Sequence, residues 1–309
     1  MGEFDAGGLD SPFDTEISLV GPLRRPRQML HEQKYGGHSS VHDSTTANRL
    51  GLAGAPIEGP THFSQFDPLA VAAFGREWFT SGCISAHFST MVVEGEDVRA
   101  TLTPTGVRRS RIGATKLDDS VVLTGTATVG PDAPTALGDR LASQGDPGEL
   151  FIVDQLFVGQ RTSSPRPVSV DLDTSNGDFY PFSLRQKLDG ITELTSWYSS
   201  DDNPWGRAIL PFEMISVLAQ KSGSDLPVRG PALGLFLDLE IRLISGPLYV
   251  GQSYAVEREV VGLSQSRRTE SYWVRTTLSD VEGGRSVAEV LLHSGVFKAS
   301  YEGYPTDRL

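Results

Sequence analysis

The two halves of the chain repeat one order of segments, and this repeat limits the possible folds more than any other feature of the sequence. In the first half an amphipathic segment over 55–74 precedes an apolar, strand-like stretch over 84–93. The second half has an amphipathic segment over 207–222, followed by a strand-like stretch over 235–244. A repeat of this length predicts two copies of one structural unit, each too small to bury its apolar face alone.

Turn residues support the alignment of the two halves. Gly95 and Gly251 each follow the strand-like stretch of their half and are 156 residues apart. The pairs Ser110-Arg111 and Ser266-Arg267 match at the same offset. We therefore expect the two pairs to occupy equivalent positions in the two units.

Within each half the patterns favour antiparallel strands after one main helix. Residues 121–129 alternate between two faces, which is the period of a half-buried strand. Residues 280–284 resemble a hairpin turn, and 286–296 the strand that returns from it. Residues 212–222 follow Pro211 with apolar residues at helical spacing. In the equivalent segment of the first half, Pro68 should break or kink the helix.

The remaining stretches predict little regular structure. Residues 130–169 carry clustered prolines and one apolar piece over 150–158, which indicates a linker with at most one strand. Residues 171–203 have no clean period and predict a loop with short helices. Residues 1–14 are rich in Gly and Asp and are expected to form a flexible arm.

Composition excludes several classes of protein. A net charge of -12 would repel a phosphate backbone, so we expect no nucleic-acid partner. The absence of a long apolar run predicts no membrane span, and the single Cys83, expected to be buried, fits a reducing compartment. We therefore predict a cytoplasmic protein.

Five aromatic residues are expected mainly in the core or at its rim. They are Trp78, Phe79, Trp197, Tyr198 and Trp205.

A loop before the first helix resembles a known motif. The stretch 35–42 (Tyr-Gly-Gly-His-Ser-Ser-Val-His), followed by Ala47, Gly51 and 57–59 (Ile-Glu-Gly), is similar to the MaoC-like (R)-specific enoyl-CoA hydratase family. Residues 107–111 and 265–268 also resemble central strands of that family. The resemblance implies an α+β double hotdog, in which each unit is a curved antiparallel sheet around a central helix.

This resemblance also implies where the two units begin and end, and which one carries the chemistry. The N-terminal hotdog would span 15–160 and hold the catalytic half, and the C-terminal hotdog would span 161–309 and accommodate the acyl chain. On the family motif His42 takes the place of the catalytic histidine, whereas Gly37 stands for the catalytic aspartate and Ser39 for the asparagine. The position in the second half that corresponds to His42 is near Leu194.

The candidate site residues follow from these positions. His42 is of the right type for acid/base chemistry, and Asp43, Glu58 or His38 could replace the missing aspartate. The backbone N–H of Gly59 would hold the thioester oxygen as negative charge develops.

Positive charge suggests where the carrier of the acyl group would bind. The phosphates of coenzyme A favour Arg109 and Arg111 as binding residues, although arginines on exposed strands also serve solubility alone. The four histidines between 31 and 62 lack the spacing of a metal site, and we expect neither a metal nor a cofactor.

The sequence therefore predicts a lyase that hydrates or dehydrates acyl thioesters, either an (R)-specific enoyl-CoA hydratase or a 3-hydroxyacyl dehydratase. Its partner would be a thioester of coenzyme A or of acyl carrier protein. Two alternatives remain, a non-catalytic acyl-thioester-binding or scaffold protein with a degenerate site, and a hotdog thioesterase. A homodimer is left open.

Overall fold

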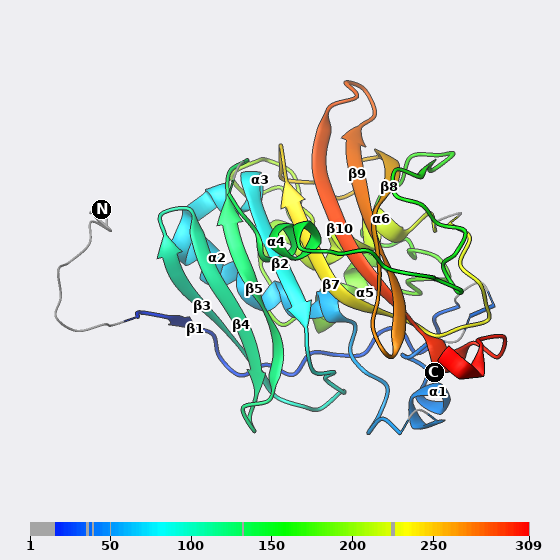
Figure 1. Cartoon of the computed structure of the whole chain (residues 1–309). Coiled ribbons are helices and arrows are strands. Elements are labelled where there is room, and N and C mark those ends of the chain that lie inside the picture. The colour runs from blue at the N-terminus through cyan, green and yellow to red at the C-terminus, as the bar shows by residue number, and fades with distance from the viewer. Residues whose placement is uncertain are drawn as a thin grey trace.

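The strands of the protein form one continuous antiparallel sheet (Figure 1). The computed structural model describes residues 16–34, 37–38, 40–49, 51–131, 133–223 and 226–308. Across this described part, the ten strands follow the order β1-β3-β4-β5-β2-β7-β10-β9-β8-β6. The first five strands in the chain form one half of the sheet and the last five form the other. The expected flexible arm at residues 1–14 lies outside the described residues.

Each half supplies five strands. Those of the first half are β1 (Leu19–Val20), β2 (Gly82–Phe88), β3 (Val98–Gly106), β4 (Arg109–Lys116) and β5 (Val121–Val129). Those of the second half are β6 (Arg161–Ser163), β7 (Gly234–Leu243), β8 (Tyr254–Gln265), β9 (Thr269–Asp280) and β10 (Ser286–Phe297).

The two faces of the sheet are covered differently. On the inner face, the 3-10 helix η1 (Gly59–Phe66) and helices α2 (Asp67–Phe74) and α6 (Phe212–Gln220) pack against the strands and one another. On the outer face, α4 (Ala136–Ala142) lies over β2, β5 and β7 (Figure 1). The other helices are α1 (Ser44–Arg49), η2 (Gly75–Glu77), α3 (Trp78–Ser81), α5 (Leu184–Gly190), η3 (Ser196–Tyr198), η4 (Lys298–Ser300) and η5 (Thr306–Arg308).

The expected repeat is present in the backbone. Strands β2 and β7 join the two halves in antiparallel register, with Ile84 opposite Ile241. Isolated bridges occur at equivalent places, where Pro56 pairs with Val93 and Ile209 pairs with Tyr249. Two antiparallel units, each packed on its own helix segment and joined edge to edge, form the arrangement expected of a double hotdog.

Turn positions confirm one part of the alignment and correct another. Gly95 and Gly251 both have positive φ, at 94° and 74°, and both precede the equivalent strands β3 and β8. Ser110 and Arg111 lie inside β4, whereas Ser266 and Arg267 lie in the turn between β8 and β9. The Ser-Arg match is therefore wrong, because the strands of the second hairpin are longer and shift the turn along the sequence.

Several elements differ from their expected bounds. The first-half strand β2 ends at Phe88 instead of continuing to residue 93. The segment 150–158 is not a strand, and its buried Ile152, Val153 and Leu156 belong to the cluster of Tyr304. The proline-rich linker holds the unexpected helix α4, which begins where Thr135 Oγ1 accepts a hydrogen bond from the Gly138 N–H. Pro68 starts the new helix α2 directly after η1, so the expected break is confirmed.

The core is shared by the two halves. Cys83 is buried as expected. Trp78 Nε1 and Tyr198 Oη each donate to the buried Asp67 carboxylate at 2.8 Å, and Phe79 packs against Trp197 and Trp205 at 6.0 Å between ring centroids. These aromatic residues thus serve packing, as predicted. No helix in the described ranges has the length and apolar character needed to cross a membrane.

Candidate functional site

A cavity of about 420 Å³ lies on the inner face of the sheet, and both halves contribute to its wall. The first half brings three titratable side chains that the sequence had singled out, His38, His42 and Glu58, together with Gly59. From the second half the lining includes Leu235, Phe236, Leu237, Tyr272, Val274, Val290 and Leu292. Because most of these second-half residues are apolar, the cavity joins a polar end to an apolar wall.

His42 stands at the start of α1 with its imidazole held in one orientation. His42 Nδ1 lies 2.8 Å from the Pro56 carbonyl oxygen, which can only accept, so Nδ1 carries the proton. Nε2 is then the basic nitrogen of the neutral ring. Burial lowers the pKa of His42 and outweighs the hydrogen bond to Pro56, so the ring is neutral and basic at neutral pH.

Asp43, which neighbours His42, is engaged by the backbone of α1. Its Oδ1 accepts from the Thr46 N–H at 2.8 Å and caps the start of α1. That hydrogen bond holds the pKa of Asp43 below its ordinary value, and Asp43 does not line the cavity. The expectation that Asp43 replaces the missing aspartate is therefore not supported by its position.

Glu58 and Gly59 enter the site at the beginning of η1. Glu58 is only 7% exposed, and burial raises its pKa to about 7, with Glu213 adding to this and Lys187 opposing it. Glu58 can therefore hold a proton near neutral pH. Gly59 is the first residue of η1, where backbone N–H groups lack a partner within the helix. A Cβ at Gly59 would lie 2.7 Å from Phe88 Cζ, so the side chain of Phe88 leaves room only for glycine.

An ion pair is buried behind Glu58. Lys187 of α5 and Glu213 of α6 are 4% and 1% exposed, and Lys187 Nζ lies 3.0 Å from Glu213 Oε2. Lys187 Nζ also donates to Thr61 Oγ1 at 3.0 Å, and Glu213 Oε1 accepts from Ser64 Oγ at 2.6 Å. The pair therefore ties η1 to the central helix of the second half and places a positive charge near Glu58.

Other candidate residues from the same loop lie nearby. His38 lines the cavity, and its Nδ1 is 3.2 Å from the Ala232 N–H. Gly37, which takes the place of the family aspartate, is exposed with φ 89°, a conformation that an aspartate would adopt only with strain. Ser39 lies outside the described residues.

The histidines do not form a metal site within the described chain. His31 is exposed, whereas His62 lines the cavity and is buried. Burial, with a further contribution from Lys187, lowers the pKa of His62 to about 4, so this ring is neutral at physiological pH. Across the described ranges no three His, Cys, Asp or Glu side chains gather in a group that could hold a metal ion.

Arg109 and Arg111 are not part of the cavity wall. Both belong to β4, and Arg111 Nη2 pairs with Glu16 Oε2 at 2.7 Å on the surface. The stretch 107–111 covers the turn after β3 and the first three residues of β4, and 265–268 covers the last residue of β8 and the turn before β9. The structure therefore does not bring these arginines to the other candidate residues.

We expect the double substitution Arg109→Ala and Arg111→Ala to leave affinity for coenzyme A within about twofold of the unsubstituted protein. The reason is that an exposed ion pair contributes little free energy and that neither side chain reaches the cavity. Calorimetric titration with coenzyme A checks this result. A drop in affinity of tenfold or more would return the two arginines to the binding site.

Sequence reasoning missed Lys187, Glu213 and Tyr180 as parts of the site. A side-chain hydrogen bond from Tyr180 lowers the pKa of Glu58, against the larger effect of burial. Lys187 stands between Leu184 and Leu188 on the buried face of α5. A lysine at helical spacing within an apolar stripe was the one available signal, because such a residue must find a buried partner.

The comparisons agree with this architecture at the level of the fold. No protein-family model matches the sequence, and no curated protein does so either. Among solved structures, a protein named as a MaoC domain protein dehydratase from Chloroflexus aurantiacus J-10-fl aligns over 96% of this chain and 99% of its own, with a TM-score of 0.60 and 15% identity. A Mycobacterium tuberculosis protein described as having a double hotdog fold aligns over 90% and 96%, with a TM-score of 0.52 and 14% identity.

These similarities establish the double hotdog fold of the present chain. The α+β class and the joining of two hotdog units, both predicted from the sequence, are confirmed. The division at residues 160 and 161 stays a prediction, although β6, the first strand of the second half, begins at Arg161.

Proposed function

We propose that the protein is an acyl-thioester hydro-lyase, which hydrates a 2-enoyl thioester or dehydrates the corresponding 3-hydroxyacyl thioester. The observation that carries this proposal is a neutral, oriented imidazole and a buried carboxyl of raised pKa in one cavity, His42 and Glu58. Hydration needs such a pair, since one group must take a proton from water and another must give one to carbon. The fold shared with a protein named as a dehydratase supports the same class.

The proposed steps use residues of the first half. His42 Nε2 takes a proton from a water whose oxygen attacks the β carbon. Negative charge moves to the thioester oxygen, where the Gly59 N–H donates to it. Glu58 then gives its proton to the α carbon, and the proton on His42 returns to Glu58 through solvent. The net change is the addition of one water, and dehydration follows the reverse order.

The second half lacks the equivalent groups, which supports one active unit. Pro211 precedes the first residue of α6 as Glu58 precedes the first residue of η1, so the second half has no acid at this position. Leu194, the position that corresponds to His42, is 67% exposed. The apolar side chains of β7, β9 and β10 instead fit the apolar part of an acyl group.

The direct test is turnover on a series of trans-2-enoyl thioesters of coenzyme A from four to twelve carbons, followed by loss of enoyl absorbance. Turnover on any member supports a hydro-lyase. Binding of coenzyme A thioesters without turnover would favour a non-catalytic binding protein. Release of free thiol, measured with a thiol reagent in the same reactions, would favour a thioesterase.

The Glu58→Gln substitution should remove the alkaline limb of the pH profile. Burial raises the pKa of Glu58 to about 7, so the protonated acid is available below that pH and is lost above it. Hydratase activity of the unsubstituted protein should therefore fall as pH rises through about 7. The amide of the variant does not titrate, so its lower activity should stay flat across this range. A variant that keeps the alkaline limb would assign the limb to another group.

A further inference from the structure

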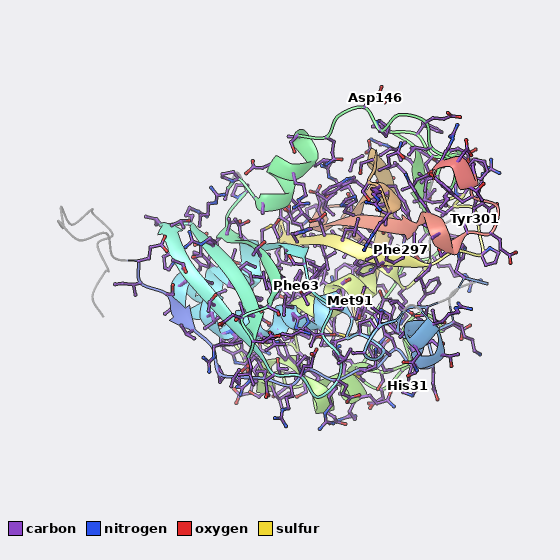
Figure 2. The ribbon with its side chains drawn as sticks, turned by 60° about the horizontal axis from the view of Figure 1, so that its bottom comes forward. His31, Phe63, Met91, Asp146, Phe297 and Tyr301 are labelled. Carbon is purple, nitrogen blue, oxygen red and sulfur yellow. The ribbon has the colours of Figure 1, made fainter. Side chains whose placement is uncertain are left out.

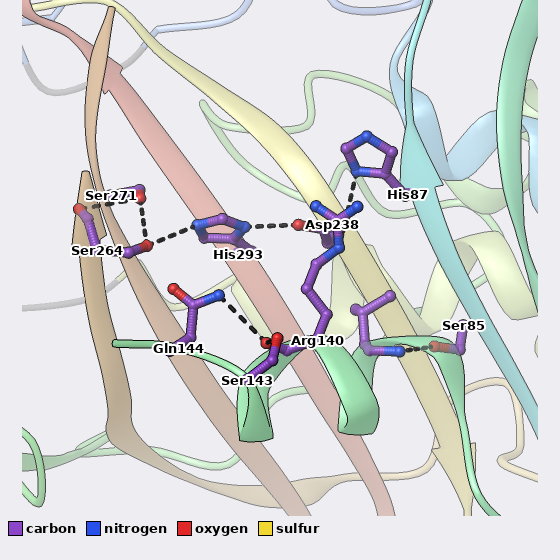
Figure 3. Close-up of polar contacts among 10 residues, drawn as sticks. Ser85, His87, Arg140, Ser143, Gln144, Asp238, Ser264, Ser271 and His293 are labelled. Carbon is purple, nitrogen blue, oxygen red and sulfur yellow. Dashed lines mark hydrogen bonds and ion pairs between the residues drawn. The ribbon is translucent and has the colours of Figure 1, made fainter. Parts of the chain in front are cut away.

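A second group of chemically competent side chains lies on the outer face, on the opposite side of the sheet from the cavity. Asp238 of β7, His293 of β10 and Ser264 of β8 come together there (Figure 3). His293 Nδ1 is 2.5 Å from Asp238 Oδ2, and His293 Nε2 is 3.4 Å from Ser264 Oγ. None of the three residues lines the cavity, so the hydro-lyase proposal does not use them.

The imidazole of this group is held in one orientation. Burial alone would raise the pKa of Asp238, but hydrogen bonds from His293 and His87 outweigh it and hold this pKa below its ordinary value. Asp238 is therefore a carboxylate that accepts the Nδ1 proton of His293, and Nε2 then faces Ser264. Trp273 stacks on the ring of His293 at 4.0 Å and 9° between planes, which fixes the ring.

The hydroxyl of Ser264 has an acceptor in each direction. Ser271 Oγ donates to the Ser264 carbonyl at 3.1 Å, so the single hydroxyl proton of Ser264 can point to Ser271 Oγ at 2.8 Å or to His293 Nε2 at 3.4 Å. The imidazole is the stronger base of the two acceptors. The longer distance is the looser spacing that nucleophile and base often have before a substrate binds.

The linker between the two halves contacts β8 on both sides of Ser264. Leu141, at the end of α4, packs closely on Gly262. A Cβ added to Gly262 would lie 2.9 Å from Leu141 Cδ1. Further along, the side chain of Gln265 donates to the Pro147 carbonyl. The intervening linker carries the exposed Asp146, at the opposite edge of the molecule from His31 (Figure 2). Ser264 itself is half-buried.

We propose that Ser264, His293 and Asp238 form a second site that acts on small acyl esters. Ser264 Oγ forms a bond to the acyl carbon while its proton passes to His293 Nε2. The bond from the acyl carbon to the alcohol oxygen breaks, and the alcohol leaves with the proton from His293. Water then attacks the acyl-serine through the same base, releasing the carboxylic acid and restoring Ser264. Asp238 acts as a positioning residue.

The size of the substrate follows from the surroundings. The apolar groups that border the site, Leu141 and Trp273, belong to one packed cluster. The pocket that Leu141 also lines is bordered by the charged side chains of Glu240, Arg242, Arg275 and Glu289, which do not suit a long apolar chain. A short acyl group such as acetyl or butyryl therefore fits this face, whereas a long chain would remain in water.

A fluorophosphonate probe tests this assignment without requiring knowledge of the natural ester. Its phosphorus accepts the serine oxygen and releases fluoride, which leaves a stable adduct. The full chain should gain one probe per molecule, mapped to Ser264 by peptide mass spectrometry. Ser264→Ala should abolish labelling, and His293→Gln should slow it by about a hundredfold or more. Ser266→Ala is the matched control, because this exposed serine lies two residues away and should label normally when replaced.

Two further measurements make the outcome decisive. The rate of p-nitrophenyl acetate hydrolysis should fall in the same variants that lose labelling. His42→Ala should change neither this rate nor the labelling. Melting temperatures show whether His293→Gln is folded. If it is not folded, the test of the second site rests on the mapped adduct and on the loss of labelling in Ser264→Ala. No adduct under conditions that fully label a known serine hydrolase, or equal labelling of Ser264→Ala, would overturn the second site and leave the hydro-lyase proposal untouched.

Discussion

His42→Ala should lower hydro-lyase turnover by at least about a hundredfold while changing the melting temperature by only a few degrees. A positioned acid/base group contributes this much to rate, and His42 is the half-buried cavity histidine whose Nδ1 is held by the Pro56 carbonyl, leaving Nε2 as the base. The lost hydrogen bond costs only about 1 kcal/mol of unfolding free energy. Turnover on an enoyl thioester and thermal unfolding of the same sample measure the two quantities together.

The matched control for this prediction is His31→Ala. His31 is exposed, with a side chain 69% accessible, and does not line the cavity, so its removal should leave turnover unchanged. Equal turnover in His42→Ala and the unsubstituted protein would rule out the assigned role. A variant that loses several kcal/mol of stability with its activity would indicate a structural role for His42.

The parts of the fold that the sequence predicts well are those governed by local rules. Residues 121–129 form β5 with the expected bounds, because alternation over nine residues between turns leaves few other options. Gly95 and Gly251 were matched because each turn requires the positive φ that glycine adopts freely. In contrast, α4 was missed because Gly138 interrupts a short helix that prolines precede.

The residues of the candidate site also fall into those that the sequence could predict and those that it could not. His42, Glu58 and Gly59 could be proposed together because they lie within one short stretch of sequence. Lys187 and Glu213 reach the site from far along the chain, and only their tertiary contacts with η1 bring them beside Glu58. No spacing rule links such residues, since their proximity is a consequence of the tertiary fold.

Removing the charge of Lys187 alone should destabilise the fold more than any other substitution considered. Lys187→Met leaves the carboxylate of Glu213, only 1% exposed, without its cation, and breaking a buried ion pair in this way costs about 3–5 kcal/mol. Lys187 also lowers the pKa of Glu58 in the folded protein, so its removal raises that pKa further. Denaturant unfolding at several pH values measures both effects.

The sign of the pH effect follows from proton binding. In Lys187→Met the folded state holds a proton on the buried Glu58 carboxyl that the unfolded chain has already released, so stability should fall as pH rises above the ordinary carboxyl range. The double variant Lys187→Met with Glu213→Gln removes both charges, while the amide oxygen can still accept from Ser64. It should recover much of the loss, because neither member of the pair is then left charged and alone. If the double variant is as unstable as the sum of both single variants, the two charges do not interact, and the ion pair is not what ties η1 to α6.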